Sequence, residues 1–155
     1  MKFITDANLG KLVKWLRILG YDTTFHTGNA DRSFLRKAQK EGRIALTRKR
    51  DLARREFSGR LFVIQNDHVQ DQIREIMDEL HIHPQPERWF TICLKCNEKL
   101  EEVPKEEIAG MVPPYVFENC SHFHTCPRCR GIFWPGTHRD NIHRFFKTHI
   151  GPHHP

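Results

Sequence analysis

The sequence predicts an α/β domain with a central parallel sheet, followed by a small zinc ribbon. In the first part of the chain, short apolar or β-branched runs alternate with longer segments whose apolar residues recur every three or four positions. That alternation is typical of a parallel sheet with helices on its faces. Two C-x-x-C pairs follow later in the chain, and Pro84 and Pro86 stand between the two regions. We therefore expect two domains, residues 1–83 and 84–155.

The predicted elements follow from apolar spacing and from the residues that end helices, such as Gly20 and Gly42. Strands are predicted at residues 2–5, 21–26, 43–47 and 61–64. Helices are predicted at residues 9–19, between Asp31 and Gly42, at 48–57, and through Ile73, Ile76, Met77 and Leu80. In the ribbon we expect a helical turn at 104–107, an extended segment at 112–114 and a helix at 139–149.

The composition indicates a globular protein with an anionic partner. Apolar residues make up 38% of the chain and charged residues 28%. No apolar run approaches the roughly 20 residues of a membrane span, and the start has no signal-peptide core, so we expect a cytoplasmic protein without a membrane partner. Lysine and arginine outnumber aspartate and glutamate by 25 to 19. This excess favours nucleic acid as the partner, although a merely basic surface is the alternative.

Four aspartates follow the four predicted strands. Asp6 ends the first, Asp31 follows the second, Asp51 lies about one turn beyond the third, and Asp67 follows the fourth. In parallel sheets, ligands bind beyond the carboxyl ends of the strands. Gathered carboxylates favour Mg²⁺ or Mn²⁺, which can activate water for phosphodiester cleavage. We therefore expect a metal site made of these four residues.

Three of the aspartates also have a purely structural explanation. Asp31 and Asp67 stand where helix N-caps stand. Asp51 lies among arginines and is a candidate for an exposed ion pair. Asp6 is harder to explain in this way, because aspartate is depleted in strands.

The two cysteine pairs predict a structural metal site. Cys93 and Cys96 form one pair, and Cys126 and Cys129 form the other. Four thiolates brought together in this way suit Zn²⁺ and leave no open position for chemistry. The alternatives are two disulfides or a redox dithiol. Cys120, the fifth cysteine, is expected to be a bystander.

These motifs together resemble those of a known family, the Mut-seven C-terminal RNase domain family, a PIN-like ribonuclease domain with an appended zinc ribbon. The resemblance covers nearly the whole chain. It is carried by residues 3–6, 9–12, 15–22, 30–31, 43–48 and 51–52 in the first domain, and by 93–96, 104–107, 112–114, 126–129 and 134–138 in the ribbon. It implies a PIN-like α/β/α sandwich, a divalent-metal endoribonuclease site at Asp6, Asp31 and Asp51, and RNA as substrate.

One position departs from the family pattern. The family usually reads Thr-Arg-Asp-Arg-Asp where residues 47–51 read Thr-Arg-Lys-Arg-Asp, so Lys49 replaces an acid. A protonated lysine cannot bind a cation and repels one nearby. Either Lys49 points outward while the three aspartates hold one metal, or the site is degenerate.

Three functions remain open from the sequence. The first is a metal-dependent endoribonuclease, and the second is an RNA-binding adaptor for structured RNA such as tRNA or rRNA that does not cleave. The third is a ribbon that docks a protein partner. For the first two, we expect phosphate contacts from the basic residues Lys11, Lys14, Arg17, Arg48, Lys49, Arg50, Arg54 and Arg55.

Overall fold

The computed structural model describes residues 1–150, including all their side chains except those of residues 137, 138, 149 and 150. The chain divides into two compact units, one covering residues 1–97 and the other beginning at residue 98. We describe each unit separately. The separation into functional domains at 83/84 stays a prediction.

The first unit is built on four parallel strands, which confirms the predicted α/β class. The strands are β1 (Phe3–Thr5), β2 (Thr23–Phe25), β3 (Ile44–Thr47) and β4 (Leu61–Val63), in the order β2-β1-β3-β4. Ile4 at the centre of β1 is in register with Thr24 on one side and Ala45 on the other. Because every pair is parallel, the segments that follow the four strands leave the sheet at the same edge.

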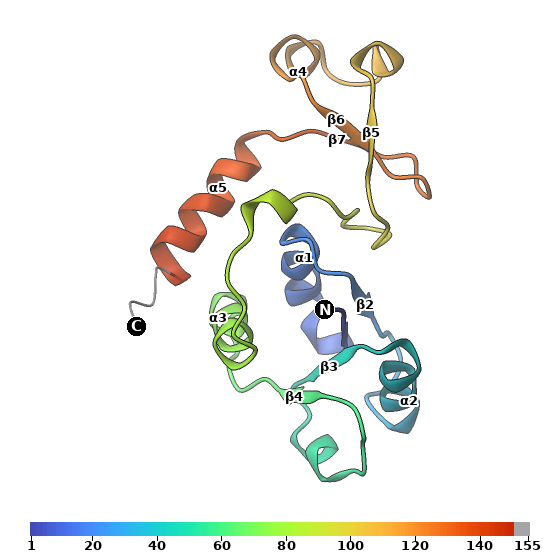
Figure 1. The fold of residues 1–155 in the computed structure, drawn as a ribbon, viewed down its shortest axis with the longest axis vertical. Coiled ribbons are helices and arrows are strands. Elements are labelled where there is room, and N and C mark those ends of the chain that lie inside the picture. The colour runs from blue at the N-terminus through green and yellow to red at the C-terminus, as the bar shows by residue number, and fades with distance from the viewer. Residues whose placement is uncertain (151–155) are drawn as a thin grey trace. The chain divides into compact units, whose positions relative to one another are not determined.

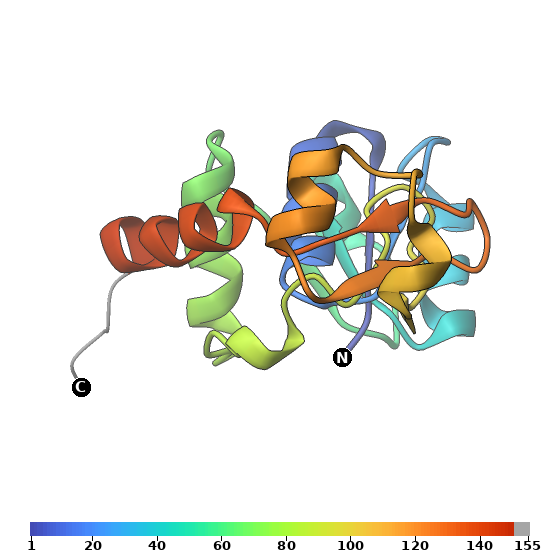
Figure 2. The ribbon, with the colours of Figure 1, turned by 90° about the horizontal axis from the view of Figure 1, so that it is seen from above.

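Helices cover both faces of this sheet. α1 (Gly10–Ile18), preceded by a 3-10 turn at Ala7–Leu9, packs against α3 (Val69–Glu79) on one face (Figures 1 and 2). α2 (Arg32–Glu41) lies on the other face (Figure 1). The three layers follow from the alternating pattern of the sequence, since each strand feeds a helix that must return along the sheet.

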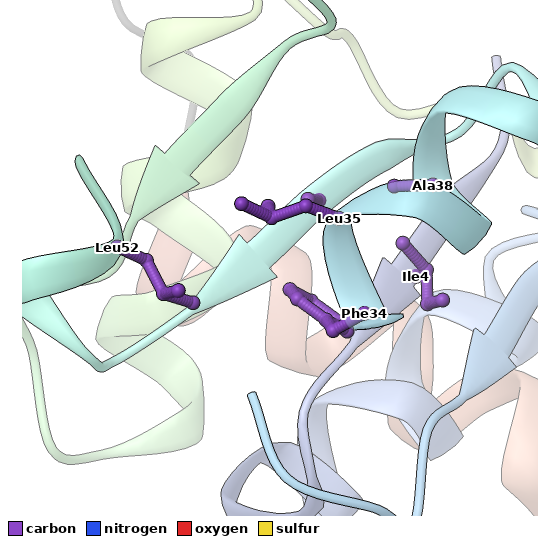
Figure 3. Packing of buried hydrophobic residues seen from close by; sticks show 6 residues of the cluster. Ile4, Phe34, Leu35, Ala38 and Leu52 are labelled. Atoms are coloured by element: carbon purple, nitrogen blue, oxygen red, sulfur yellow. The ribbon is translucent and has the colours of Figure 1, made fainter. Parts of the chain in front are cut away.

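Apolar residues of α2 and the sheet form a closed core on this second face (Figure 3). Its buried members are Ile4, Phe34, Leu35, Ala38, Ala45 and Leu52. Full burial of a side chain such as Phe34 stabilises the fold by roughly 1.5–3 kcal/mol. The core therefore fixes α2 and the start of the chain after β3 against the sheet.

The segment after β3 differs from the prediction. A helix was expected at residues 48–57, but the structure has one short 3-10 helix, Arg50–Arg54. Leu52 is the one residue of this helix that is buried. A single apolar anchor among charged neighbours provides no stripe along which a longer α-helix could pack. The prediction of a helix at residues 48–57 was therefore wrong in both the type and the length of the helix.

Gly20 allows a close approach between the end of α1 and the segment at residue 88. Its φ is +88°, and a Cβ there would collide with the Arg88 carbonyl oxygen. Arg88 also donates from Nη2 to the Gly20 carbonyl oxygen at 3.3 Å, and its guanidinium stacks on the Tyr21 ring. This region holds the chain just ahead of the first cysteine pair against the sheet domain.

We expect Gly20→Ala to lower the free energy of unfolding by about 2–4 kcal/mol, because it combines backbone strain with overpacking. Gly42→Ala is the matched control, since Gly42 has φ +64° and nothing within 4 Å of the added Cβ. That variant should lose only the strain, about 1–2 kcal/mol. Chemical denaturation measures both values. Equal losses in the two variants would show that the Arg88 contact contributes nothing.

The second unit contains a three-stranded antiparallel sheet in the order β5-β6-β7. Its elements are β5 (Glu101–Val103), a 3-10 turn (Lys105–Ile108), α4 (Pro114–Asn119), β6 (Phe123–Thr125), β7 (Ile132–Phe133), α5 (Thr137–Phe145) and a π-helical turn (Phe146–Ile150). One core cluster of this unit consists of Ile108, Val112 and Phe123 with partly buried neighbours, and Leu100, Ile142 and Phe146 are also buried.

Three predictions in this unit can be compared with the structure. The helix expected at 139–149 is present as α5, which is followed by the π-helical turn. The helical turn at 104–107 is present as the 3-10 turn. The segment 112–114 was expected to be wholly extended, but α4 starts at Pro114, the first helical position, where proline is favoured.

Across the described residues, no helix has the length and apolarity needed to cross a membrane.

Candidate functional site

Asp6 lies at the carboxyl edge of the sheet, directly after β1, and only 2% of it is exposed. One carboxylate oxygen, Oδ1, accepts a hydrogen bond from the Asn8 amide at 2.9 Å, so Asp6 caps the 3-10 turn that follows. The other, Oδ2, accepts from the Thr47 hydroxyl at 2.6 Å. A buried carboxylate held from both sides is fixed in orientation before any ligand arrives.

Thr47 is a site residue that sequence reasoning missed. It ends β3, and its buried hydroxyl donates to Asp6 while accepting from the Lys49 amide at 3.0 Å. Thr5 of β1 is in register with Leu46 of β3, which places Thr47 beside Asp6. The strand pairing is therefore the signal that would have identified it, and pairing is not visible in a single sequence.

Asp31 has the structural role, capping of a helix, that was the alternative to metal binding. It caps α2, and its Oδ1 accepts from the Ser33 amide at 2.9 Å and the Ser33 hydroxyl at 2.7 Å. These bonds favour the charged form and lower the pKa of Asp31. The carboxylate is therefore ionised at neutral pH and lies at the start of α2.

Lys49 lies between the Asp31 loop and Asp51. Its ammonium is 3.3 Å from the Ala30 carbonyl oxygen and 3.8 Å from Asp51 Oδ2. The side chains of Lys49 and Asp51 are both about half exposed. Lys49 therefore does not simply point outward. Its positive charge neutralises part of the charge of Asp51, and its ammonium links the loops that follow β2 and β3, the strands on either side of β1.

Asp67 pairs with Arg48, with Nη1 and Oδ1 2.5 Å apart. The Asp67 side chain is 78% exposed. Ion pairs this exposed contribute at most about 1 kcal/mol. The contact joins the segments that follow β3 and β4, and it leaves Asp67 in the role of a surface partner for Arg48.

The structure does not bring the four aspartates into one three-ligand group. Among the described residues, the cysteines are the one set of three or more potential ligands whose donor atoms lie close together. Mg²⁺ nevertheless commonly binds through one or two carboxylates, with water and substrate phosphates completing its shell. Asp6 suits that kind of site, since its carboxylate is fixed and has spare acceptor capacity.

The ligand atoms of Cys93, Cys96, Cys126 and Cys129 all lie within 4.8 Å of one another. Four sulfurs at about 2.3 Å from a tetrahedral zinc ion are about 3.8 Å apart, so the spacing fits Zn²⁺. Cys120 does not belong to this set and packs instead against the core of the second unit. The four residues are therefore arranged to hold a metal ion, with Cys120 as a bystander.

Both cysteine pairs have the same turn geometry. The Asn97 amide donates to the Cys93 carbonyl oxygen, and the Arg130 amide donates to the Cys126 carbonyl oxygen, each at 2.9 Å. Asn97 and Arg130 both have positive φ, at 61° and 63°. Two turns of one design, each presenting two sulfurs, are a typical means of building a four-thiolate site.

The first cysteine turn is fastened to the parallel sheet by Arg17 and Asn97. Arg17 donates from Nη1 to the Leu94 carbonyl oxygen at 2.7 Å, and from Nε and Nη2 to the Thr23 carbonyl oxygen at 3.1 and 2.9 Å. The Asn97 side chain accepts from the Thr23 amide at 2.9 Å. Arg17 was predicted to contact RNA, but these three bonds favour a structural role.

The other basic residues predicted to contact phosphate divide into two groups. Lys11 and Lys14 are exposed on α1, whereas Arg50, Arg54 and Arg55 are exposed in and after the 3-10 helix that follows β3. Arg50, Arg54 and Arg55 lie close in sequence to Asp51. Arg48 and Lys49 come directly before this group. A polyanion held there would lie beside the carboxyl edge of the sheet.

The fold and site define an α/β protein with a parallel sheet flanked by helices and a four-cysteine centre suited to a metal. The model of the Mut7-C RNAse domain family matches residues 1–146, and the chain belongs to this family. The resemblance seen in the sequence motifs is thereby confirmed, and membership indicates a nuclease or RNA-related function. Searches of curated proteins and of solved structures gave no significant match.

Proposed function

We propose that the protein is a metal-dependent endoribonuclease that cleaves RNA at the carboxyl edge of the parallel sheet. The observation that carries the proposal is the buried Asp6 carboxylate, held by Thr47 and the Asn8 amide at the edge where such sheets bind ligands. Placing a charge in so dry a position costs free energy, and binding a cation offsets that cost. Membership in an RNase domain family supports RNA as the substrate.

Several residues of the chain would have different roles in the proposed cleavage. Asp6 would bind the cation directly, with the Asp31 and Asp51 carboxylates holding water or a further contact at the same edge. Thr47 keeps Asp6 in its orientation. A Mg²⁺ or Mn²⁺ ion bound there supplies an activated water and stabilises the leaving oxygen. Lys49 and the arginines after it would bind the phosphates on either side of the scissile bond.

We propose zinc as the metal of the four cysteines. Zn²⁺ matches four thiolates, and a closed site of this kind serves structure and not chemistry. Reduced cysteines of this type are typical of a reducing compartment, which supports a cytoplasmic location.

A second candidate is an RNA-binding adaptor for structured RNA that does not cleave. It rests on one observation, the Lys49 ammonium 3.8 Å from Asp51. A fixed cation at this place weakens the attraction of Asp51 for a metal. The basic residues would then bind phosphates without cleavage following.

One experiment separates the two candidates. The zinc-loaded protein is incubated with single-stranded RNA and with a folded RNA, first without divalent ions and then with Mg²⁺ or Mn²⁺. The endoribonuclease proposal predicts internal cleavage that depends on the added metal and is unaffected by extra zinc. Salt-sensitive binding with intact RNA at every metal concentration would instead establish the adaptor.

A further inference from the structure

A cleft beside the proposed cleavage site is formed between α2 and the segment that follows the 3-10 helix Arg50–Arg54. Its volume is about 450 Å³, within the range of about 300–1,000 Å³ that ligand sites occupy. Its lining residues are Arg32, Leu35, Arg36, Gln39, Arg55, Glu56 and Phe57. The cleft lies wholly within the first unit.

The charge of this cleft is strongly positive. Its lining includes three arginines, Arg32, Arg36 and Arg55, and one acidic residue, Glu56. In the described part of the chain, none of these three arginines forms an ion pair or a side-chain hydrogen bond. Arginine side chains that lack an internal partner and line one cleft are suited to bidentate binding of phosphate.

Part of the cleft lining is apolar and belongs to the packed core or contacts it. Leu35 belongs to the buried core, and the half-buried Phe57 packs against that core. Gln39, which also lines the cleft, donates from its side-chain amide to the Ser58 hydroxyl at 2.7 Å. A lining that combines apolar and cationic side chains suits a nucleotide, which presents an aromatic base next to a phosphate.

The position of the cleft connects it to the carboxyl edge of the sheet. Arg32 directly follows Asp31, the cap of α2, and Arg55 lies just past the 3-10 helix that contains Asp51. Arg36 is one helical turn beyond Arg32, about 6 Å along the axis. An RNA strand that passes Asp31 and Asp51 would therefore reach the two arginines of α2, Arg32 and Arg36, one after the other.

We propose that this cleft is a subsite for single-stranded RNA, in which Arg32, Arg36 and Arg55 bind phosphates next to the scissile one. The assignment rests on the proposed function, because it takes RNA as the ligand. It adds Arg32 and Arg36, two residues outside the basic set expected from the sequence. The proposed subsite also predicts that the RNA runs from the cleavage site along α2.

The test is the binding of a fluorescein-labelled single-stranded oligoribonucleotide to the full, zinc-loaded chain, without added Mg²⁺ or Mn²⁺ and over a range of salt concentrations. The variant is Arg32→Gln with Arg36→Gln. The matched control is Lys37→Gln with Lys40→Gln, which removes the same charge from exposed positions of α2 that do not line the cleft. Circular dichroism and thermal unfolding verify that each variant is folded.

We expect the arginine variant to bind about 10-fold more weakly and to lose about 1.4 from the slope of log affinity against log salt, since each single-strand phosphate contact contributes about 0.7. The lysine control should lose much less on both measures. Glu56→Gln should bind more tightly than the wild type, because it removes the one negative charge of the cleft. Equal losses in the two double variants, or no loss in either, overturns the subsite.

The subsite and the cleavage proposal fail in different ways. If the arginine variant loses binding as expected but the wild type never cleaves with added metal, the subsite stands and the endoribonuclease does not. If metal-dependent cleavage is present and both double variants bind like the wild type, the endoribonuclease stands and the subsite does not.

Discussion

Asp6→Asn is expected to reduce metal-dependent RNA cleavage by at least about 100-fold, which corresponds to about 2.7 kcal/mol in the activation barrier. The substitution keeps the shape of the side chain and removes its charge. Asparagine is as good an N-cap as aspartate, so the 3-10 turn after β1 should survive. Asparagine has only one acceptor oxygen, so one of the bonds to Asp6 is lost, and thermal unfolding of the variant verifies that the loss of cleavage reports on the charge and not on the fold.

Glu79→Gln is the control for this variant. Glu79 is exposed at the end of α3 in the same unit, so its loss changes the net charge by the same amount away from the proposed site. Cleavage rates measured at saturating RNA and saturating Mn²⁺ should be unchanged in this control. A folded Asp6→Asn variant that cleaves as fast as Glu79→Gln would remove Asp6 from the mechanism.

Loss of the four-cysteine metal site is expected to unfold the second unit. The apolar core of that unit is small in the described residues, with one buried cluster of Ile108, Val112 and Phe123 and a few further buried side chains, Leu100, Ile142 and Phe146. Zinc binding contributes about 10–16 kcal/mol in zinc-finger peptides, as much as the whole stability of a typical domain. Without the metal, this core cannot offset the entropy of ordering its chain.

Hydrogen exchange should show this directly. In Cys126→Ser, or after a strong chelator is added, amides in β5, β6 and β7 should lose protection while those of β1 and β3 keep it. Cys120→Ser is the matched control, since it makes the same chemical change outside the metal set and should retain both zinc and protection. Full protection of β6 in metal-free Cys126→Ser would mean that the ribbon does not depend on its metal.

The sequence determines the class of the fold because strands and helices leave local signals. The runs at Phe3–Thr5 and Ile44–Thr47 are apolar and short, and the apolar residues of α1 recur at helical spacing, so each element follows from its own residues. The cysteine pairs are equally local, because two close thiols on a turn already define half of a metal site.

The remaining features depend on contacts between distant segments. Thr47 lies beside Asp6 because β3 pairs with β1, and the Arg17 guanidinium donates to the carbonyl oxygen of Leu94, a residue far away in the sequence. The 3-10 helix after β3 forms because only Leu52 can be buried there. Long-range pairing of this kind cannot be obtained from periodicity, so charge alone suggested RNA contacts for Arg17 and did not suggest the cleft at Arg36.

The most direct test of the account is whether Asp6 binds a divalent cation at all. The zinc-loaded wild type and Asp6→Asn are titrated with Mn²⁺, and free Mn²⁺ is measured by electron paramagnetic resonance. The account predicts one Mn²⁺ ion bound by the wild type that Asp6→Asn does not bind, with the zinc content equal in the two proteins. Identical Mn²⁺ binding curves for the two folded proteins would contradict it.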